Sequence, residues 1–166
     1  MKQHTITSYF YSELPTDEAK ANAREWFSSG NQYDDLPIFL RDSLNTLLEE
    51  NNITADTKPE IYYSLSYCQG DGVQFLGTFT HREKSYTITS IGHYSHSYCT
   101  EISADDEEDT NSEELAQFTE LYHTVCKQLE DAGYAEIEYQ DSEEYIAESL
   151  EANEYQFTKD GRLFTH

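Results

Sequence analysis

The feature that most constrains the fold is a change in the spacing of apolar residues along the chain. Between residues 60 and 102 they recur at every second position, beginning with Ile61, Tyr63, Leu65 and Tyr67. Before and after this segment they recur every three or four positions. A spacing of two is typical of a half-buried strand, and a spacing of 3.6 is typical of an amphipathic helix. The sequence therefore predicts an antiparallel sheet with helical segments before and after it.

The first part of the chain contains one short strand signal and two helix signals. Residues 5–12 alternate weakly, which favours a strand. Thr16 is a natural N-cap for a helix that Gly30 would end. Pro37 is well placed in the first turn of a second helix.

After the sheet segment, a third helix is predicted to end at Gly133. A short strand over 134–139 is expected to follow. Asp141 or Ser142 would cap a fourth helix, and Asp160-Gly161 favours a hairpin turn near the end of the sequence.

We therefore predict an α+β fold, with an antiparallel sheet of about four to six strands and about four helices packed on it. A length of 166 residues favours one domain over 1–166 with a single core. Only 37% of the residues are hydrophobic, but 14 Tyr and 8 Phe supply large side chains for burial.

The chain is strongly acidic, with 33 acidic and 10 basic residues and a net charge of −23. This charge argues against nucleic acid or an anionic membrane as a direct partner, because both are polyanions. No segment approaches the roughly 20 apolar residues of a membrane span, and "MKQHTITSYF" lacks the apolar core of a signal peptide. None of the three cysteines lies in a CxxC pair, so we expect a reduced, cytoplasmic setting.

The negative charge is concentrated in one part of the chain. Residues 101–154 hold 19 acids and one base, Lys127, whereas residues 1–100 have a net charge of only −6. This segment is either a solvated acidic face or a mimic of a nucleic acid backbone. At about 1.7 Å of duplex axis per charge, its net −18 would match roughly 30 Å of DNA. The candidate contact residues are Asp105, Asp106, Glu107, Glu108, Asp109, Glu113, Glu114, Glu143 and Glu144.

The segment Gln69-Gly70-Asp71-Gly72 lies between two alternating runs. Two glycines favour a hairpin turn that needs positive φ. The alternative is a ligand loop, in which backbone N–H groups and the Asp71 carboxylate would contact a small molecule. No Lys-Ser/Thr follows, as a phosphate loop requires, and Asp71 has no evident acid–base partner. We therefore predict no catalytic residue and no enzymatic activity.

His93, His96 and Cys99 have a spacing that superficially suggests a metal site. Tyr94, His96 and Tyr98 alternate, which favours a strand, and on a strand residues three apart point to opposite faces. We therefore predict no metal and no cofactor. A small enzyme or metal protein that uses Asp71, His93 and His96 is retained as a third alternative.

Four segments together resemble one protein family. They are "CQGDGVQF", "ELPTDEAKANAREWF", "GHYSHSYC" and "ANEYQFTKDGRLF". They are similar, in the same order, to the "SQGDGASF", "ELSDEAKEKAREWY", "GHYYHSGC" and "ANEYEFTEDGRRF" segments of a family of small phage and prophage proteins. Cys68 stands in place of Ser, and Val73-Gln74 in place of Ala-Ser. The resemblance implies a phage or mobile-element origin and an intracellular protein, some members being labelled antitoxin, and it carries over no catalytic residue.

These observations lead to two main expectations for function. The first is a phage-type inhibitor that binds a nucleic-acid-handling defence protein of the host cell, such as a restriction or CRISPR component, by acidic mimicry. The alternative is an antitoxin-like or assembly module that binds a protein through a tyrosine-rich surface. The partner's identity and the oligomeric state stay open.

Overall fold

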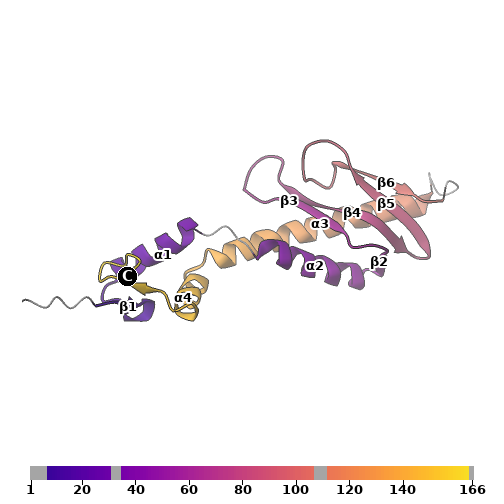
Figure 1. Ribbon diagram of the computed structural model, residues 1–166. Coiled ribbons are helices and arrows are strands. Elements are labelled where there is room, and N and C mark those ends of the chain that lie inside the picture. Colours follow the sequence, from indigo (N-terminus) through magenta and orange to yellow (C-terminus); the bar gives the residue numbers. More distant parts are fainter. Residues whose placement is uncertain (1–6, 31–34, 107–111, 165–166) are drawn as a thin grey trace, which may run out of the picture. The chain divides into compact units, whose positions relative to one another are not determined.

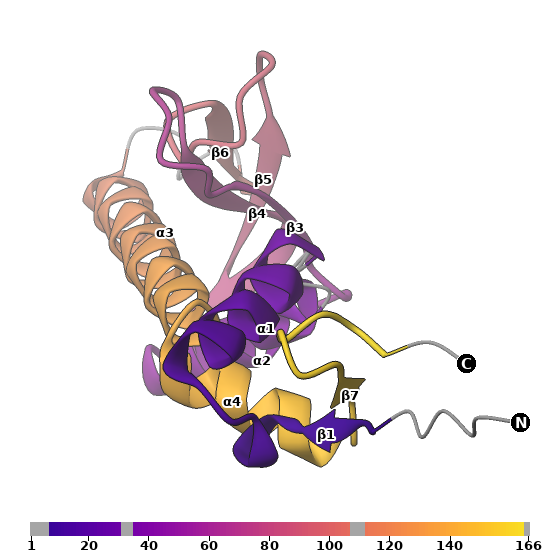
Figure 2. The same ribbon diagram turned by 90° about the vertical axis from the view of Figure 1, so that its left-hand side faces the viewer.

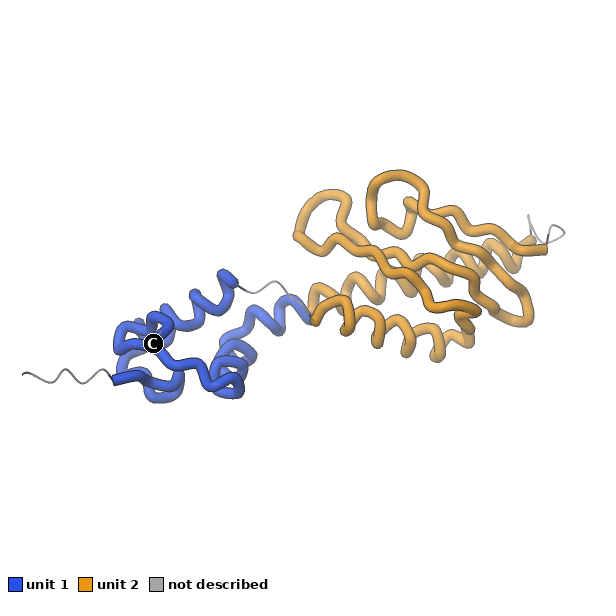
Figure 3. Tube along the Cα trace, viewed as in Figure 1, with its two compact units in different colours: residues 1–34, 136–166 blue, residues 35–135 orange. Residues whose placement is uncertain are grey.

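The computed structural model describes residues 7–30, 35–106 and 112–164. The chain divides into two compact units (Figure 3). Residues 35–135 form the sheet unit, and residues 1–34 with 136–166 form the terminal unit. Each unit has its own cluster of buried hydrophobic residues, so the single core expected from the length is wrong. The assignment of 1–166 to one domain stays a prediction.

The predicted α+β class is confirmed, with a five-stranded antiparallel sheet in the sheet unit. Its strands are β2 (Ile53–Ala55), β3 (Glu60–Ser64), β4 (Gly72–His81), β5 (Lys84–Ser90) and β6 (Thr100–Ala104). Two helices, α2 (Leu36–Glu50) and α3 (Glu113–Gln140), lie against one face of this sheet (Figure 1). The helix predicted at Pro37 is α2.

β4 is the central strand, and its two halves have different neighbours. β2 and β3 pair with it on one side, β3 over Gly72 to Leu76 and β2 over Phe79 to His81. On the other side, β5 pairs only from Gly77 onward. The first half of β4 therefore has a strand on one side only.

A tyrosine of α3 supplies hydrogen-bond partners to the backbone at the middle of this unpaired edge of β4. The Tyr122 hydroxyl donates to the Phe75 carbonyl at 3.0 Å and accepts from the Phe75 N–H at 3.2 Å. A buried backbone donor and acceptor would otherwise be left without partners, which is costly. The two rings pack at 4.6 Å between centroids, and burial raises the pKa of Tyr122.

α3 is longer than the sequence indicated. It continues through Gly133 to Gln140, so the helix end predicted at Gly133 and the strand predicted over 134–139 are both wrong. A Cβ atom at Gly133 would lie 2.5 Å from Cδ1 of Leu65, in the loop after β3. Gly133 therefore allows close packing of that loop on the helix, which a sequence pattern does not distinguish from a helix end.

Two predicted strands are also corrected. Residues 91–99, with Tyr94, His96 and Tyr98, form a loop, and β6 begins only at Thr100. In the described part of 5–12, the extended structure is limited to β1 (Tyr9–Phe10), which the 3₁₀ helix η1 (Tyr11–Glu13) follows.

The terminal unit joins the two ends of the described chain. It contains β1, η1, α1 (Asp17–Gly30), the last turn of α3, α4 (Glu143–Ala152) and β7 (Gln156–Phe157). β1 pairs with β7, and α1 packs against α4. The caps predicted at Thr16 and Ser142 are confirmed, since Thr16 Oγ1 accepts from Ala19 N at 3.1 Å and Ser142 Oγ accepts from Tyr145 N at 3.2 Å. A cap predicted at Asn111 for α3 lies outside the described residues, and Ser112 Oγ accepts from Leu115 N at 3.1 Å.

The turn predicted at Asp160-Gly161 is confirmed, and it has a second function in packing. Thr158 N–H donates to the Arg162 carbonyl at 2.7 Å, and Gly161 has a φ of +84°. A Cβ atom at Gly161 would lie 1.9 Å from the backbone oxygen of Ala19 in α1. Glycine is required here both by the backbone conformation and by this close approach.

We predict that Gly161→Ala lowers the free energy of unfolding by at least about 1–3 kcal/mol, because the turn must move away from α1. Gly30→Ala is the matched control, since a Cβ at Gly30 meets nothing within 4 Å. It should be neutral or stabilise α1 by up to about 1 kcal/mol. Urea denaturation of both variants tests this, and equal stabilities would contradict the packing role of Gly161.

Candidate functional site

The loop over residues 65–71 is organised around one carboxylate. Asp71 Oδ2 accepts from the backbone N–H of Ser66 at 2.9 Å and of Cys68 at 3.1 Å. Its Oδ1 accepts from the hydroxyls of Ser64 at 3.1 Å and Ser66 at 3.2 Å. The Tyr134 hydroxyl of α3 also donates to Oδ2. Asp71 thus closes the loop on itself and ties it to the helix.

These contacts set the ionisation of both partners. The Tyr134 hydroxyl, followed by the backbone N–H groups of Cys68 and Ser66, holds the pKa of Asp71 well below its usual range. Burial, with the neighbouring carboxylate, raises the pKa of Tyr134 to about 12. Asp71 is therefore a permanent acceptor near neutral pH and is unsuited to proton transfer there, which supports a structural role.

The two glycines of the predicted turn serve different purposes. Gly70 has a φ of +94°, as the sequence predicted, and a Cβ there would lie 3.3 Å from the Tyr94 ring. Gly72 is the first residue of β4, and its Cβ would lie 2.9 Å from the His96 Cα. The connection is also longer than the four residues 69–72, because β3 ends at Ser64. The glycines therefore let the 65–71 loop approach the 91–99 loop.

Figure 2 shows these two loops side by side beyond the ends of the strands. Gln74 of β4 joins the 91–99 loop to the sheet by donating from Nε2 to the Tyr94 carbonyl at 2.7 Å. Gln74 is almost fully buried on the side of the sheet opposite the helices. The 91–99 loop therefore covers the region of β4 that β5 does not reach.

The aromatic residues of the 91–99 loop stack on α3. Tyr98 lies over the His123 ring at 4.2 Å between centroids with the planes 18° apart, and His96 stacks on Tyr98 at 5.2 Å. His96 Nδ1 accepts from the Tyr98 N–H at 3.1 Å, and His123 Nδ1 lies 3.0 Å from the Ser97 hydroxyl. Burial, with the neighbouring His96, lowers the pKa of His123. These contacts fix the position of the Tyr98 ring.

Four exposed tyrosines lie on the two loops and on the strand β3 that precedes the first of them. We call Tyr62, Tyr67, Tyr94 and Tyr98 the tyrosine surface, and their exposed fractions are 48%, 66%, 63% and 72%. Tyr67 packs on Tyr134 at 4.8 Å between ring centroids. Tyr62 lies opposite Gln74 in the β3–β4 ladder, and Gln74 bonds the backbone of Tyr94. The tyrosine surface thus combines exposed rings with a backbone that ring packing and hydrogen bonds hold in place.

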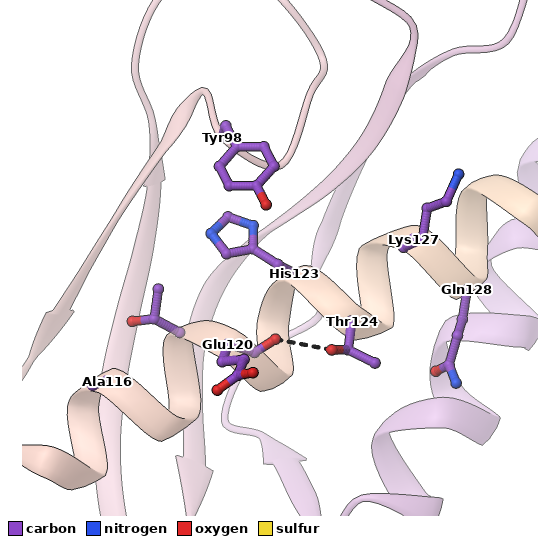
Figure 4. Close-up of a pocket in the computed structure, with 8 residues that line it drawn as sticks. Tyr98, Ala116, Glu120, His123, Thr124, Lys127 and Gln128 are labelled. Carbon is purple, nitrogen blue, oxygen red and sulfur yellow. Dashed lines mark hydrogen bonds between the residues drawn. The ribbon is translucent and has the colours of Figure 1, made fainter.

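An open hollow of about 660 Å³ lies beside Tyr98, along the exposed side of α3 (Figure 4). We call the helical residues that line it the α3 strip: Ala116, Thr119, Glu120, His123, Thr124, Lys127 and Gln128. Most of these side chains are small or uncharged, and Glu120 and Lys127 are the two ionised ones.

The acidic residues predicted as partner contacts are distributed over both units. Glu107, Glu108 and Asp109 lie outside the described residues. Glu143 and Glu144 belong to the terminal unit, where Glu143 lies 3.5 Å from Arg24. Both are in the first turn of α4, a position that the helix dipole favours on its own.

The other four predicted acids belong to the sheet unit and have local contacts. Asp105 accepts from the Thr87 hydroxyl of β5 at 2.7 Å, and Glu114 pairs with Lys84 of β5 at 2.6 Å. Asp106 follows Asp105, and Glu113 precedes Glu114 in the first turn of α3. The two acidic pairs are therefore gathered next to the same strand.

Within residues 7–30, 35–106 and 112–164, no group of three His, Cys, Asp or Glu side chains could hold a metal ion. His93, His96 and Cys99 are not brought together as such a group, and His96 Nδ1 accepts the Tyr98 N–H at 3.1 Å. Burial raises the pKa of the third cysteine thiol, Cys126, to about 12, which disfavours its reactive thiolate form.

No protein-family model, curated protein or solved structure matches the chain. The resemblance to phage and prophage proteins therefore stays a prediction. In the described part of the chain, no helix combines the length and apolar character needed to cross a bilayer.

Sequence reasoning missed Tyr134 and His123, the two α3 residues that hold the loops. Their signal was weak, because both lie within a helical pattern and far from the loops in sequence. The alternating tyrosines were recognised but were assigned to strands. The sequence feature that indicates two adjoining loops is a glycine-rich turn followed by an aromatic, histidine-rich segment.

We predict that Asp71→Asn destabilises the protein by about 1–3 kcal/mol near neutral pH, because an amide nitrogen cannot accept the loop's hydrogen bonds. Since folding lowers the pKa of Asp71, its stabilisation is present above the unfolded pKa of about 3.9 and is lost as pH falls below it. The difference from wild type should therefore shrink in acid.

Asp131→Asn is the control, because Asp131 is exposed and pairs only weakly with Lys127 at 3.1 Å. It should change stability by no more than about 0.5 kcal/mol. Chemical denaturation from pH 7 down to pH 3 measures both variants. A pH-independent difference between Asp71→Asn and wild type would show that the carboxylate charge does not hold the loop.

Proposed function

We propose that the protein is a non-enzymatic, phage-type inhibitor that binds a basic, nucleic-acid-handling protein in the host cytoplasm through the tyrosine surface. The observation that carries the proposal is the exposure of Tyr67, Tyr94 and Tyr98 on two adjoining loops, with Tyr62 exposed on the neighbouring strand β3. A single exposed aromatic residue is ordinary, but a contiguous group is typical of a protein-binding surface.

Tyrosine suits this role because it combines a large apolar ring with a hydroxyl that can bond to a partner. It also loses little conformational entropy on binding, since it has two side-chain torsions. Here the rings are already supported, Tyr67 by Tyr134 and Tyr98 by His123. Such pre-organisation lowers the entropic cost of association.

The charge of the sheet unit supports a basic partner. This unit has 19 acidic and five basic residues, a net charge of −14. A negative field of this size accelerates association with a positively charged surface and disfavours acidic proteins. Proteins that handle nucleic acids carry basic surfaces, which makes them the partner class that the charge favours.

The test uses the purified full chain as bait in a bacterial host lysate, with mass spectrometry of the bound proteins. Affinities of the purified partner for Tyr94→Ala and Tyr98→Ala are then measured. We expect each change to raise Kd by about 30-fold, as for a hot-spot residue. Tyr139→Ala is the control, because Tyr139 is an exposed tyrosine of the terminal unit. Unchanged Kd values for both loop variants would refute the proposed surface.

Acidic mimicry of nucleic acid is the second candidate, and one observation favours it. Asp105 and Glu114 both contact β5, which brings the acids that follow β6 next to those that begin α3. Asp106 and Glu113 extend this acidic end of the sheet unit. Several carboxylates in one place would fit the basic groove of a DNA- or RNA-binding protein.

We expect the mimicry to fail when Asp105, Asp106, Glu113 and Glu114 are changed together to Asn or Gln. This variant should no longer compete with duplex DNA for the captured partner. The wild type should compete well at 0.1 M salt and poorly at 1 M, since the Debye length falls from about 10 to 3 Å. Changing Asp42, Glu49, Glu50 and Asp131 together to Asn or Gln is the control for charge alone, since it removes four exposed carboxylates elsewhere in the sheet unit. Simultaneous binding of DNA and protein to the partner would exclude mimicry.

A further inference from the structure

The α3 strip has an unusual distribution of charge for this chain. The strip contains one acid, Glu120, and one base, Lys127. Lys127 is the single basic residue in a segment, 101–154, that otherwise holds 19 acids. Its ammonium group lies 3.1 Å from Asp131 and 3.6 Å from Glu130, but it is 65% exposed, so these pairs are weak and exchangeable. A lysine at this position is therefore available for a stronger contact with an external carboxylate.

The charged residues of the strip are placed so that two antiparallel copies of α3 can bring opposite charges next to each other. If two copies of α3 lie antiparallel with the two-fold axis between His123 and Thr124, Glu120 of one copy is level with Lys127 of the other. The same axis places Thr119 level with Gln128 of the second copy. Both relations occur twice, as a two-fold interface requires.

The surface of the strip also permits close approach. Ala116, Thr119 and Thr124 are small, and helices with small residues at the contact pack with axes about 8–10 Å apart. Tyr98 forms one wall of the hollow. Its ring packs on His123 and would lie against the edge of α3 of the second copy. Figure 4 shows Glu120, Thr124 and Lys127 on successive turns of this exposed side.

We propose that the α3 strip is the contact surface of a homodimer, in which two copies of α3 pack antiparallel and Glu120 of each copy pairs with Lys127 of the other. This inference does not rest on the proposed function, although Tyr98 borders both surfaces. The two ion pairs specify the register and orientation of the helices. The rest of each acidic protein repels its copy, so the dimer is of moderate affinity.

The experiment is sedimentation equilibrium of the full chain at about 0.15 M salt, where the Debye length of about 8 Å screens long-range repulsion but not contact pairs. Wild type should be a reversible dimer. Glu120→Lys and Lys127→Glu each convert both ion pairs into like-charge pairs, and each should raise the dimer Kd at least 10-fold. The double variant E120K/K127E restores opposite charges and should dimerise like wild type.

Mixing the two single variants is the most specific measurement. One chain then has lysine at both positions and the other has glutamate at both, so a heterodimer forms two correct pairs while each homodimer forms none. Glu49→Lys is the matched control, since it makes the same charge change at an exposed residue of α2 outside the strip. It should leave the dimer Kd unchanged.

Three results would overturn the proposal. The first is a wild type that stays monomeric up to about 1 mM, a concentration at which a binding free energy of only about −4 kcal/mol would already produce dimer. The second is a dimer that neither single variant weakens. The third is a mixture of the two variants that forms no heterodimer although circular dichroism shows both to be folded.

Discussion

The constraint on which the sheet unit depends is the unequal pairing of β4. Its first half has β3 on one side and no strand on the other, because β5 begins to pair only at Gly77. Backbone groups on a buried edge must find partners. The Tyr122 hydroxyl supplies them at Phe75, and the 91–99 loop covers the adjacent region through Gln74. The buried Tyr122 of α3 and the 91–99 loop are thus both in contact with the half of β4 that β5 leaves unpaired.

The candidate binding surface is a consequence of this arrangement. The 91–99 loop fills the gap, and the 65–71 loop packs beside it, since Gly70 and Gly72 permit the approach. Asp71 and His123 then hold the two loops on α3. The tyrosines that remain outside are exposed on a backbone that the interior of the unit has already ordered. Rigid support and exposed aromatic rings are the combination that favours specific protein binding.

The fold class, the caps at Thr16 and Ser142 and the turn at Gly161 could be predicted from the sequence, because each depends on residues close together in the chain. Gly133 was misassigned because its small size serves a contact with Leu65, which is distant in sequence. For the same reason, the partnership of Asp71 with Tyr134 was not predictable, although Asp71 itself was singled out. Composition shows that acidic residues are concentrated in 101–154, but local spacing does not show which of them pair with Lys84 or Arg24.

The pairing of β1 with β7 has a consequence for the order of events during synthesis. Residues 7–30 are synthesised before residues 35–135, yet their partners in α4 and β7 are synthesised after them. Residues 35–135, which contain the whole five-stranded sheet, are complete well before that. Residues 7–30 therefore wait for α4 and β7, and apolar side chains such as Trp26 lack their packing partners in the meantime. Residues 35–135 need no later segment to complete their sheet.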